Sequence, residues 1–344
     1  MRISDFDYEL PPSAIAQEAL EPRDAARLMR LPRSGEPATD HTFRDLPRLL
    51  RKGDLVVVNR SRVIPARLLG RRPGGGAAEV FLLKDLGDDR WQALVRPGRR
   101  LRPGHTVTID ADLAAVVETE AVGNEGRRVV HLRARRGGVE DALLRTGHVP
   151  LPPSIRRQDR PDDRTRYQTV YARELGSVAA PTAGLHFTEE LLGALAAAGV
   201  ERAEVVLHVG PGTFRPVKAD DVEDHRLEPE PFVVPEAAAA AVAATRARGG
   251  RVVAVGTTVV RVLEAAAGDD GAVAAGEGET ALVVRPGHRF RVVDALVTNF
   301  HLPRSSLLLL VAAFAGRERI LAAYAEAIRR GYRFYSYGDA MLLE

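Results

Sequence analysis

Two loops of the chain each combine a glycine-containing turn with a histidine and a threonine. The first loop is residues 181–188 (PTAGLHFT), and the second is residues 208–214 (HVGPGTF). Histidine is the side chain that most readily exchanges a proton near neutral pH, and glycine lets the backbone approach a ligand closely. One such loop could be an ordinary turn. Two loops with matching residue types favour a ligand pocket in which proton transfer takes place.

A third small-residue segment, Gly256-Thr257-Thr258, separates an apolar stretch (residues 251–255) from a helical pattern (residues 259–267). A strand, a short turn and a helix in this order direct the amides of the helix N-terminus towards an anion. The two threonines could bind a carboxylate or a phosphate, or they could simply cap the helix. The polar residues at the end of a further apolar stretch are Thr298, Asn299 and His301.

Several common reaction classes lack their sequence signatures in this chain. It contains no cysteine, so a disulfide framework, a thiolate zinc site and a cysteine nucleophile are excluded. No GxSxG, Walker A or GxGxxG motif occurs, which disfavours serine hydrolysis, ATP hydrolysis and hydride transfer. The spacing typical of metal ligands is also lacking among the loop histidines His186, His208, His225 and His301. A pocket of Thr, His, Asn and Arg side chains remains, and it could transfer protons on an organic substrate without a bound metal.

The basic residues are concentrated in two segments, although the net charge of the chain is only +3. Four arginines lie between residues 96 and 102, and five lie between residues 156 and 166. Arginine suits phosphate binding, so these segments could contact nucleic acid. Asp159, Asp162 and Asp163 lie among the second group, and a solvated surface held by salt bridges is the alternative.

The sequence pattern changes along the chain in a way that predicts two domains. Residues 77–136 contain short alternating apolar segments at hairpin spacing, without a long helix, which predicts a small antiparallel β-barrel or sandwich. Strand and helix patterns alternate through residues 177–344, which predicts a layered α/β domain. We therefore expect a discontinuous α/β domain of residues 1–68 and 148–344, and an inserted β-barrel domain of residues 69–147.

The composition places the chain among globular proteins. Its 344 residues are 45% hydrophobic and 28% charged, which is enough for a packed core and unlike a disordered segment. The first residues, MRISDFDYEL, lack the apolar core of a signal peptide. The longest strongly apolar run, Leu307 to Ala315, is too short to cross a bilayer. Together with the absence of cysteine, these features predict a cytoplasmic protein.

Five segments of the sequence resemble a known family. They are PTAGLHFT, LHVGPGTFRPV, VGTTVVRVLE, TNFHLPRSSLLLLV and YRFYSYGDAML, and the likeness begins at DFDYELPPSAIAQ near the N-terminus. The family is that of the S-adenosylmethionine:tRNA ribosyltransferase-isomerases of queuosine biosynthesis. Long matches in the same order over essentially the whole chain are far more specific than a single glycine motif.

The resemblance implies a transferase that consumes S-adenosylmethionine as a cosubstrate, with no bound cofactor and no metal. Such an enzyme moves the ribosyl part of S-adenosylmethionine onto the aminomethyl group of a 7-deazaguanine at the wobble position of the tRNA anticodon stem-loop. Adenine and methionine leave, and the product is epoxyqueuosine. This chemistry needs a base beside the sulfonium, a seat for the methionine carboxylate and a pocket for the flipped-out base. The resemblance also implies a monomer.

The resemblance further implies roles for individual residues. His186 and His208 are the candidates for proton transfer. The candidate S-adenosylmethionine-binding residues are Thr182, Gly184, Phe187, Thr188, Gly210, Gly212, Thr213, Phe214, Gly256, Thr257, Thr258, Arg261, Thr298, Asn299 and His301. Four of these, from Gly256 to Arg261, would seat the carboxylate at a helix N-terminus. The candidate tRNA-binding residues are Arg156, Arg157, Arg166, Asn59 and Arg62.

The segment of residues 225–231 (HRLEPEP) departs from the family pattern His-x-Met-His-x-Glu-aromatic. Glu228 stands in place of the second histidine, and Pro231 stands in place of the aromatic residue. Two alternatives therefore stay open, namely the same chemistry on a free deazapurine nucleoside or other small acceptor, and a non-catalytic RNA-binding relative. Binding of the anticodon stem-loop would separate the first alternative from the leading interpretation. Release of adenine from S-adenosylmethionine would exclude the second.

Overall fold

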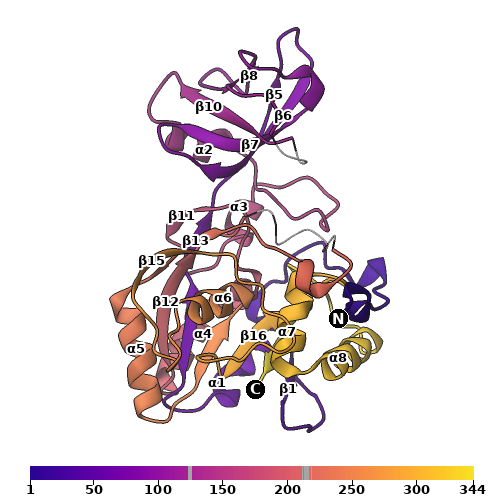
Figure 1. The fold of residues 1–344 in the computed structure, drawn as a ribbon, viewed down its shortest axis with the longest axis vertical. Coiled ribbons are helices and arrows are strands. Elements are labelled where there is room, and N and C mark those ends of the chain that lie inside the picture. The colour runs from indigo at the N-terminus through magenta and orange to yellow at the C-terminus, as the bar shows by residue number, and fades with distance from the viewer. Residues whose placement is uncertain (123–125, 211, 213–216, 218) are drawn as a thin grey trace.

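The computed structural model describes the whole chain except residues 123–125, 211, 213–216 and 218. It contains an α/β domain built on a nine-stranded sheet and a closed barrel of six strands. Figure 1 shows the barrel set apart at one end of the molecule. The predicted fold class, an α/β main domain with an inserted small antiparallel β-barrel, is confirmed.

The sheet of the α/β domain has the strand order β15-β13-β12-β3-β14-β16-β17-β1-β2. Its central strands β12, β3, β14 and β16 run parallel to one another. Strands β3, β14 and β16 are buried at every residue, as is typical of strands covered on both faces. The strands are β1 (Arg27–Leu31), β2 (Thr39–Thr42), β3 (Leu55–Asn59), β12 (Glu201–Leu207), β13 (Glu230–Val234), β14 (Val252–Val255), β15 (Gly276–Thr280), β16 (Ala295–Asn299) and β17 (Ala340–Leu343).

Helices cover both faces of this sheet. Leu55 and Val57 of β3 pack on the face covered by α5, α6, α7 and α8, whereas Val56 and Val58 pack on the face covered by α1 and α4. Among the described residues, no helix has the length and apolar character needed to cross a membrane. The helices are α1 (Leu46–Leu49), α4 (Glu189–Ala197), α5 (Glu236–Ala247), α6 (Thr257–Ala265), α7 (Ser306–Ala315) and α8 (Arg317–Arg329).

The barrel closes in the order β10-β7-β6-β5-β8-β9, and residues of α2 pack into its core. A β-bulge at Leu83 shifts the register between β6 and β7. Leu82 lies in the barrel core, whereas Leu83 is buried outside that core, because neighbouring strand residues face opposite sides. The elements are β5 (Arg67–Arg71), β6 (Ala77–Asp85), β7 (Arg90–Arg96), β8 (Thr106–Thr108), β9 (Leu113–Val117), β10 (Arg128–Ala134) and α2 (Val139–Thr146).

The chain enters and leaves the barrel at adjacent points. Strand β4 (Ser61–Val63) follows β3 directly and pairs with β11 (Glu174–Ser177) before the chain reaches the barrel. At the crossing, Arg67 and His148 exchange two backbone hydrogen bonds of 3.2 and 2.9 Å. The barrel is therefore joined to the α/β domain at the edge of the sheet where β3 ends.

Candidate active site

The carboxyl ends of the parallel strands meet at one edge of the sheet. Strand β3 ends at Asn59, β12 at Leu207, β14 at Val255 and β16 at Asn299. In open α/β sheets this edge is where ligands bind. The polar loops predicted from the sequence follow these strands, so the topology alone brings several of them together.

A small pocket lies at this edge, which we call the strand-end pocket. Its volume is about 50 Å³. Thr182 donates a hydrogen bond of 2.8 Å to the Oδ1 of Asn299 across the pocket. The structure thus brings together seven of the residues predicted to bind the cosubstrate, and these are Thr182, Gly256, Thr257, Thr258, Thr298, Asn299 and His301.

The N-terminus of α6 opens into the strand-end pocket. Gly256 has a φ of +90°, a left-handed conformation that favours glycine, and no side chain caps the helix. Thr258 is only 8% exposed, and within the described part of the chain its Oγ1 has no hydrogen-bond partner. Buried hydroxyl groups are normally paired. The helix N-terminus and this hydroxyl together suit an anionic group such as a carboxylate.

His301 makes the far wall of the pocket polar but uncharged. Its Nε2 lies 2.8 Å from the Oγ1 of Thr298. Burial lowers the pKa of His301 to about 3, because the charged imidazolium would lose its hydration. His301 therefore stays neutral near pH 7 and can take part in hydrogen bonds without adding charge.

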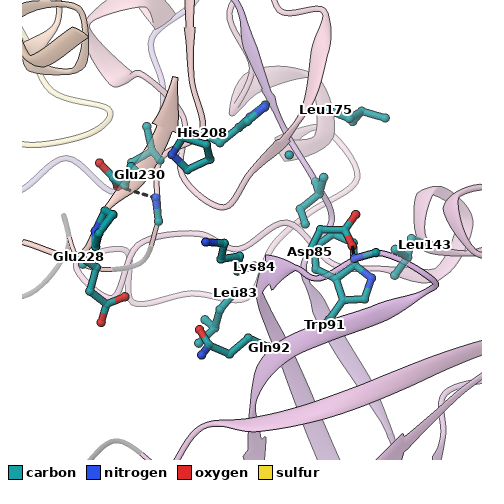
Figure 2. A pocket seen from close by; sticks show the side chains of 18 of the residues that line it. Leu83, Lys84, Asp85, Trp91, Gln92, Leu143, Leu175, His208, Glu228 and Glu230 are labelled. Atoms are coloured by element: carbon teal, nitrogen blue, oxygen red, sulfur yellow. Dashed lines mark hydrogen bonds between the residues drawn. The ribbon is translucent and has the colours of Figure 1, made fainter. Parts of the chain in front are cut away.

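A much larger cavity lies between the barrel and the α/β domain, which we call the interdomain cavity. Its volume is about 580 Å³. Figure 2 shows Leu83, Trp91 and Gln92 of the barrel facing His208 and Glu230 of the α/β domain across it. Apolar walls with a few converging polar groups are typical of ligand sites. Val209 lines both this cavity and the strand-end pocket, so the two are neighbours.

His208 precedes Val209 and lines the interdomain cavity. A Cβ atom at Gly176 would lie 2.8 Å from the His208 ring, so only glycine allows the ring this position. Burial lowers the pKa of His208, and the charge of Glu174 opposes this shift. Its Nδ1 is buried without a hydrogen-bond partner in the described chain. At neutral pH, His208 is thus an uncharged imidazole that can accept a proton.

His186, the other predicted proton-transfer residue, occupies a structural position. Its Nδ1 and Nε2 lie 3.1 and 2.9 Å from the backbone oxygens of Ala183 and Gly338. The ring stacks on Phe43 with a centroid distance of 4.9 Å, and burial lowers its pKa. Because both nitrogens face carbonyls and the ring lines neither pocket, His186 fastens the loop instead of facing a ligand.

The other residues of the first loop also serve packing. A Cβ atom at Gly184 would lie 2.1 Å from the Oη of Tyr171. Phe187 is fully buried in the core beneath the sheet. Thr188 is the N-cap of α4, because its side chain accepts a hydrogen bond of 3.1 Å from the amide of Leu191. These three residues were predicted to bind the cosubstrate, but the structure directs them away from both pockets.

The second loop lies along the interdomain cavity. Gly210 and Gly212 line it, while the predicted residues Thr213 and Phe214 lie outside the described residues. Arg261 also lines the cavity instead of the strand-end pocket. Its guanidinium binds the carboxylate of Glu230 and donates to the backbone oxygens of Leu282 and Thr280 at 3.0 and 3.1 Å. Arg261 therefore holds Glu230 and residues 280–282 together, and it lies outside the strand-end pocket at the N-terminus of α6.

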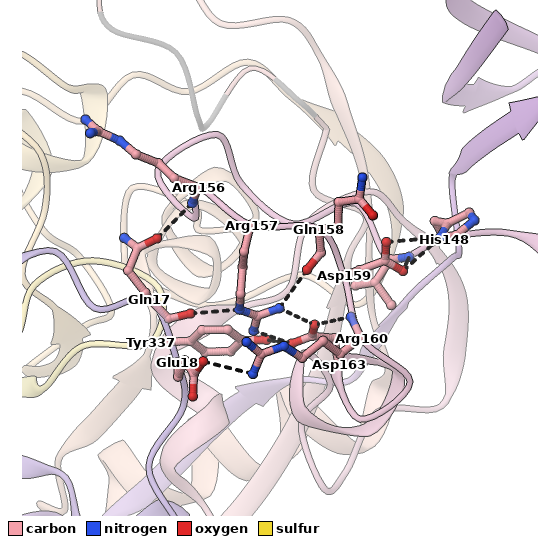
Figure 3. A network of polar contacts seen from close by, with 11 residues as sticks. Gln17, Glu18, His148, Arg156, Arg157, Gln158, Asp159, Arg160, Asp163 and Tyr337 are labelled. Carbon is pink, nitrogen blue, oxygen red and sulfur yellow. Dashed lines mark hydrogen bonds and ion pairs between the residues drawn. The ribbon is translucent and has the colours of Figure 1, made fainter. Parts of the chain in front are cut away.

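The arginine-rich loop around α3 (Asp163–Arg166) holds a network of polar contacts, shown in Figure 3. Arg157 donates two hydrogen bonds of 2.6 and 2.9 Å to the buried carboxylate of Asp163. This pair raises the pKa of Arg157 and lowers that of Asp163 against the effect of burial. Tyr337 near the C-terminus donates to the same carboxylate at 3.0 Å. Arg157 therefore ties the loop to the rest of the domain.

The remaining predicted tRNA contacts divide into engaged and exposed residues. Arg166 binds the side chain of Glu21 and donates to the carbonyl of Leu20 at 3.2 Å. Asn59 is buried. Its Nδ2 donates to the backbone oxygen of Leu207 at 3.0 Å, and its Oδ1 accepts from the amide of Leu207 at 3.1 Å. Three of the five residues, Arg157, Arg166 and Asn59, thus hold the protein itself. Arg62 and Arg156 have exposed side chains that are accessible to a partner.

The barrel wall of the cavity was not predicted as part of a site. Arg127 of the barrel forms a two-point ion pair with Glu228 of the α/β domain, including a bond of 2.8 Å, and also donates to Gln92 at 3.2 Å. The unusual Glu228 was the available sequence signal, but it did not reveal its partner. Leu83, Trp91 and Gln92 looked like ordinary strand residues.

The fold and the two adjoining pockets define an α/β protein with an inserted β-barrel, in which a small pocket suited to an anion adjoins a larger cavity between the two domains. Among known families, the one described as “Queuosine biosynthesis protein” matches residues 3–343. The chain belongs to this family.

Relatives with the name S-adenosylmethionine:tRNA ribosyltransferase-isomerase share much of the sequence. A protein from an Anaeromyxobacter species is 58% identical over 100% of this chain and 99% of its own. One from Moorella thermoacetica is 54% identical over the full length of both. A crystal structure of an S-adenosylmethionine tRNA ribosyltransferase from Thermotoga maritima is 41% identical, covering 99% of this chain and 100% of that one, with a TM-score of 0.56.

Proposed function

We propose that the protein transfers and isomerises the ribosyl moiety of S-adenosylmethionine onto 7-aminomethyl-7-deazaguanine at the wobble position of tRNA. The products are epoxyqueuosine in the tRNA, adenine and methionine. Family membership and the names of close relatives support this reaction. The structural observation that carries it is the junction at Val209, where an anion pocket adjoins a cavity large enough for a nucleobase.

The strand-end pocket would hold the methionine end of the cosubstrate. The N-terminal amides of α6 and the free hydroxyl of Thr258 suit its carboxylate, and Thr182 and Asn299 form the opposite wall. The pocket is too small for the whole molecule. The ribosyl part would therefore extend past Val209 towards the interdomain cavity, where the acceptor amine can reach it.

His208 would be the general base of this reaction. The positive sulfonium acidifies the protons on the adjacent carbon, and a neutral imidazole can remove one of them. The lowered pKa of His208 keeps it in the neutral form at pH 7. Its position beside Val209, which borders both pockets, supports this role, because a base there would lie near both the donor and the acceptor.

The exposed side chains of Arg62 and Arg156 would contact phosphates of the anticodon stem-loop. Their guanidinium groups suit phosphate oxygens. We expect the protein to act as a monomer in the cytoplasm and to consume S-adenosylmethionine without a further bound cofactor.

Mass spectrometry of nucleosides from the treated tRNA tests this proposal. The protein is incubated with S-adenosylmethionine and tRNA that carries the aminomethyl-deazaguanine, and the tRNA is then digested. Epoxyqueuosine should replace the aminomethyl-deazaguanine. Conversion of the free nucleoside but not of the tRNA would instead support the small-acceptor alternative. No conversion of either, with the protein folded, would contradict the proposed reaction.

A further inference from the structure

We propose that the interdomain cavity is the binding site of the target nucleobase, and that Gln92 of the barrel selects that base by donating a hydrogen bond to its keto oxygen. The identity of the ligand rests on the proposed function. The inference goes beyond that function because it gives the inserted barrel a part in choosing the acceptor.

The barrel contributes apolar side chains to one part of the cavity wall. Trp91 is only 8% exposed and lines the cavity together with Leu83, which lies at the β-bulge and faces away from the barrel core. Bulges are known to redirect side chains next to active sites. Leu143 of α2 also lines the cavity and is seen near Trp91 in Figure 2. Aromatic and apolar side chains of this kind stack on a base that has left its helix.

The side-chain amide of Gln92 has a defined orientation. Arg127 donates to it at 3.2 Å, and a guanidinium has no acceptor, so the Oε1 of Gln92 must face Arg127. The Nε2 then points away from Arg127, and the one hydrogen bond of the Gln92 side chain within the described part of the chain is the bond from Arg127 to Oε1. Gln92 therefore offers amide hydrogens, not an acceptor, on the cavity wall.

The α/β domain holds this arrangement in place. Both terminal nitrogens of Arg127 bind the carboxylate of Glu228, so the orientation of Gln92 depends on a residue across the cavity. Glu228 is also the residue that departs from the family pattern. Its carboxylate gives Arg127 a fixed position, which a neutral histidine would do less strongly.

Hydrogen-bond chemistry then gives the selectivity. A deazaguanine presents a carbonyl oxygen at position 6, which accepts from the amide hydrogens of Gln92. A base with an amino group at that position presents hydrogens instead, so two donors would face each other. An unmatched buried donor costs more than the bond itself contributes. The site should therefore prefer a keto base to a 6-amino base.

The fluorescence of Trp91 provides a direct test, because the chain contains a single tryptophan. The full-length protein is titrated with free 7-aminomethyl-7-deazaguanine and with its 6-amino counterpart. The keto base should quench the fluorescence at a concentration about tenfold lower than the 6-amino base. Gln92→Leu should remove this preference while leaving the thermal unfolding temperature unchanged. Gln158→Leu, at an exposed glutamine outside the cavity, should retain it.

Three results would overturn the inference. The first is that neither base quenches the fluorescence. The second is tighter binding of the 6-amino base, as expected if the cavity held the adenine of the cosubstrate, and the third is an unchanged base preference in Gln92→Leu. A kinetic test with modified tRNA complements the titration. There Gln92→Leu should raise the KM for tRNA about tenfold and leave the KM for S-adenosylmethionine unchanged.

The two proposals fail separately. If the wild-type protein modifies tRNA but Gln92→Leu behaves like wild type in both tests, the inference about Gln92 is wrong and the proposed function stands. If the wild-type protein modifies no tRNA but shows the base preference that Gln92→Leu loses, the proposed function is wrong and the nucleobase site stands.

Discussion

The strand-end pocket and the interdomain cavity adjoin at Val209, yet they arise in different ways. The strand-end pocket is built within one domain, from the ends of β14 and β16 and the turn Thr182–His186. The interdomain cavity exists only because the barrel is placed against the α/β domain. The first is small and suits an anion, whereas the second is large and has an apolar wall.

This difference separates what topology decides from what domain assembly decides. Parallel strands end at one edge of a sheet, so polar residues after them converge whatever the details of packing. Nothing comparable directs Leu83 or Gln92 towards His208, because that meeting depends on the bulge in β6 and on the Arg127–Glu228 pair. We therefore expect mutations in the strand-end pocket to change the KM for S-adenosylmethionine. Mutations in the interdomain cavity should instead change the KM for tRNA.

The largest expected effect is at the junction of the two sites. His208→Ala should lower the rate of adenine release by about 100-fold or more, the usual contribution of a general base, without changing the thermal unfolding temperature. His225→Ala, at a half-buried histidine outside both pockets, serves as the control and should keep near-normal turnover. If adenine release by His208→Ala stayed within a factor of three of the wild-type rate, His208 would not be the general base.

The pH dependence should report the same group. Because burial lowers the pKa of His208, the residue remains unprotonated at pH 7 and gains a proton only below the ordinary histidine range. We expect kcat/KM to be constant above about pH 6.5 and to fall about tenfold per pH unit below the lowered pKa. A profile that falls with increasing pH between 6 and 8 would contradict a neutral His208 base.

Leu82 and Leu83 are adjacent in β6 but lie in different surroundings. Leu82 packs in the barrel core, whereas Leu83 lines the interdomain cavity. Leu82→Ala should lower the free energy of unfolding by about 3 kcal/mol, because Leu82 is fully buried in the barrel core. Leu83→Ala should leave the stability closer to wild type and raise the KM for tRNA about tenfold. Urea unfolding and steady-state kinetics measure these effects. A rise in the KM for S-adenosylmethionine alone would place Leu83 on the donor side.

Thr258 tests the strand-end pocket in the same manner. Thr258→Val removes a hydroxyl without a partner in the described chain, so stability should be unchanged or slightly higher, while the KM for S-adenosylmethionine rises about tenfold. The matched variant Thr245→Val removes a hydroxyl that accepts a hydrogen bond of 2.9 Å from Arg248. That variant should be less stable and bind S-adenosylmethionine normally. Equal KM values for S-adenosylmethionine in the two variants would show that the Thr258 hydroxyl does not bind the carboxylate.

The smallest effect concerns the arginine loop outside the two sites. Arg156→Ala should weaken tRNA binding about threefold and lower the slope of log affinity against log salt by about 1, with little change in stability. Arg157→Ala should instead destabilise the protein by about 3 kcal/mol, because it leaves the carboxylate of Asp163 buried without its partner. An unchanged salt slope in Arg156→Ala would exclude a phosphate contact there.

The sequence pattern predicted the fold class but not every strand. The alternating short segments of the barrel and the βα alternation of the main domain are long signals that packing does not override. Strand β17, in contrast, has only four residues at the end of the chain, yet it lies between β16 and β1 within the sheet. Such a short apolar run cannot be told from a loop segment by periodicity.

The candidate site could be predicted to the level of loops but not of individual side chains. His186 and His208 lie in similar sequence contexts, and only the carbonyls of Ala183 and Gly338 separate a structural histidine from one facing a cavity. A run of charges likewise does not show that Arg157 is paired and Arg156 exposed. These distinctions depend on how individual side chains are oriented in the fold, which the residue types and their spacing do not reveal.

Adenine release from S-adenosylmethionine, measured in parallel with modified tRNA, with unmodified tRNA and without tRNA, tests the central claim most directly. If the donor and acceptor sites adjoin as proposed, adenine should appear only with tRNA that carries the aminomethyl-deazaguanine. Adenine released at the same rate without that base, or no adenine with it, would contradict a reaction that spans the two sites.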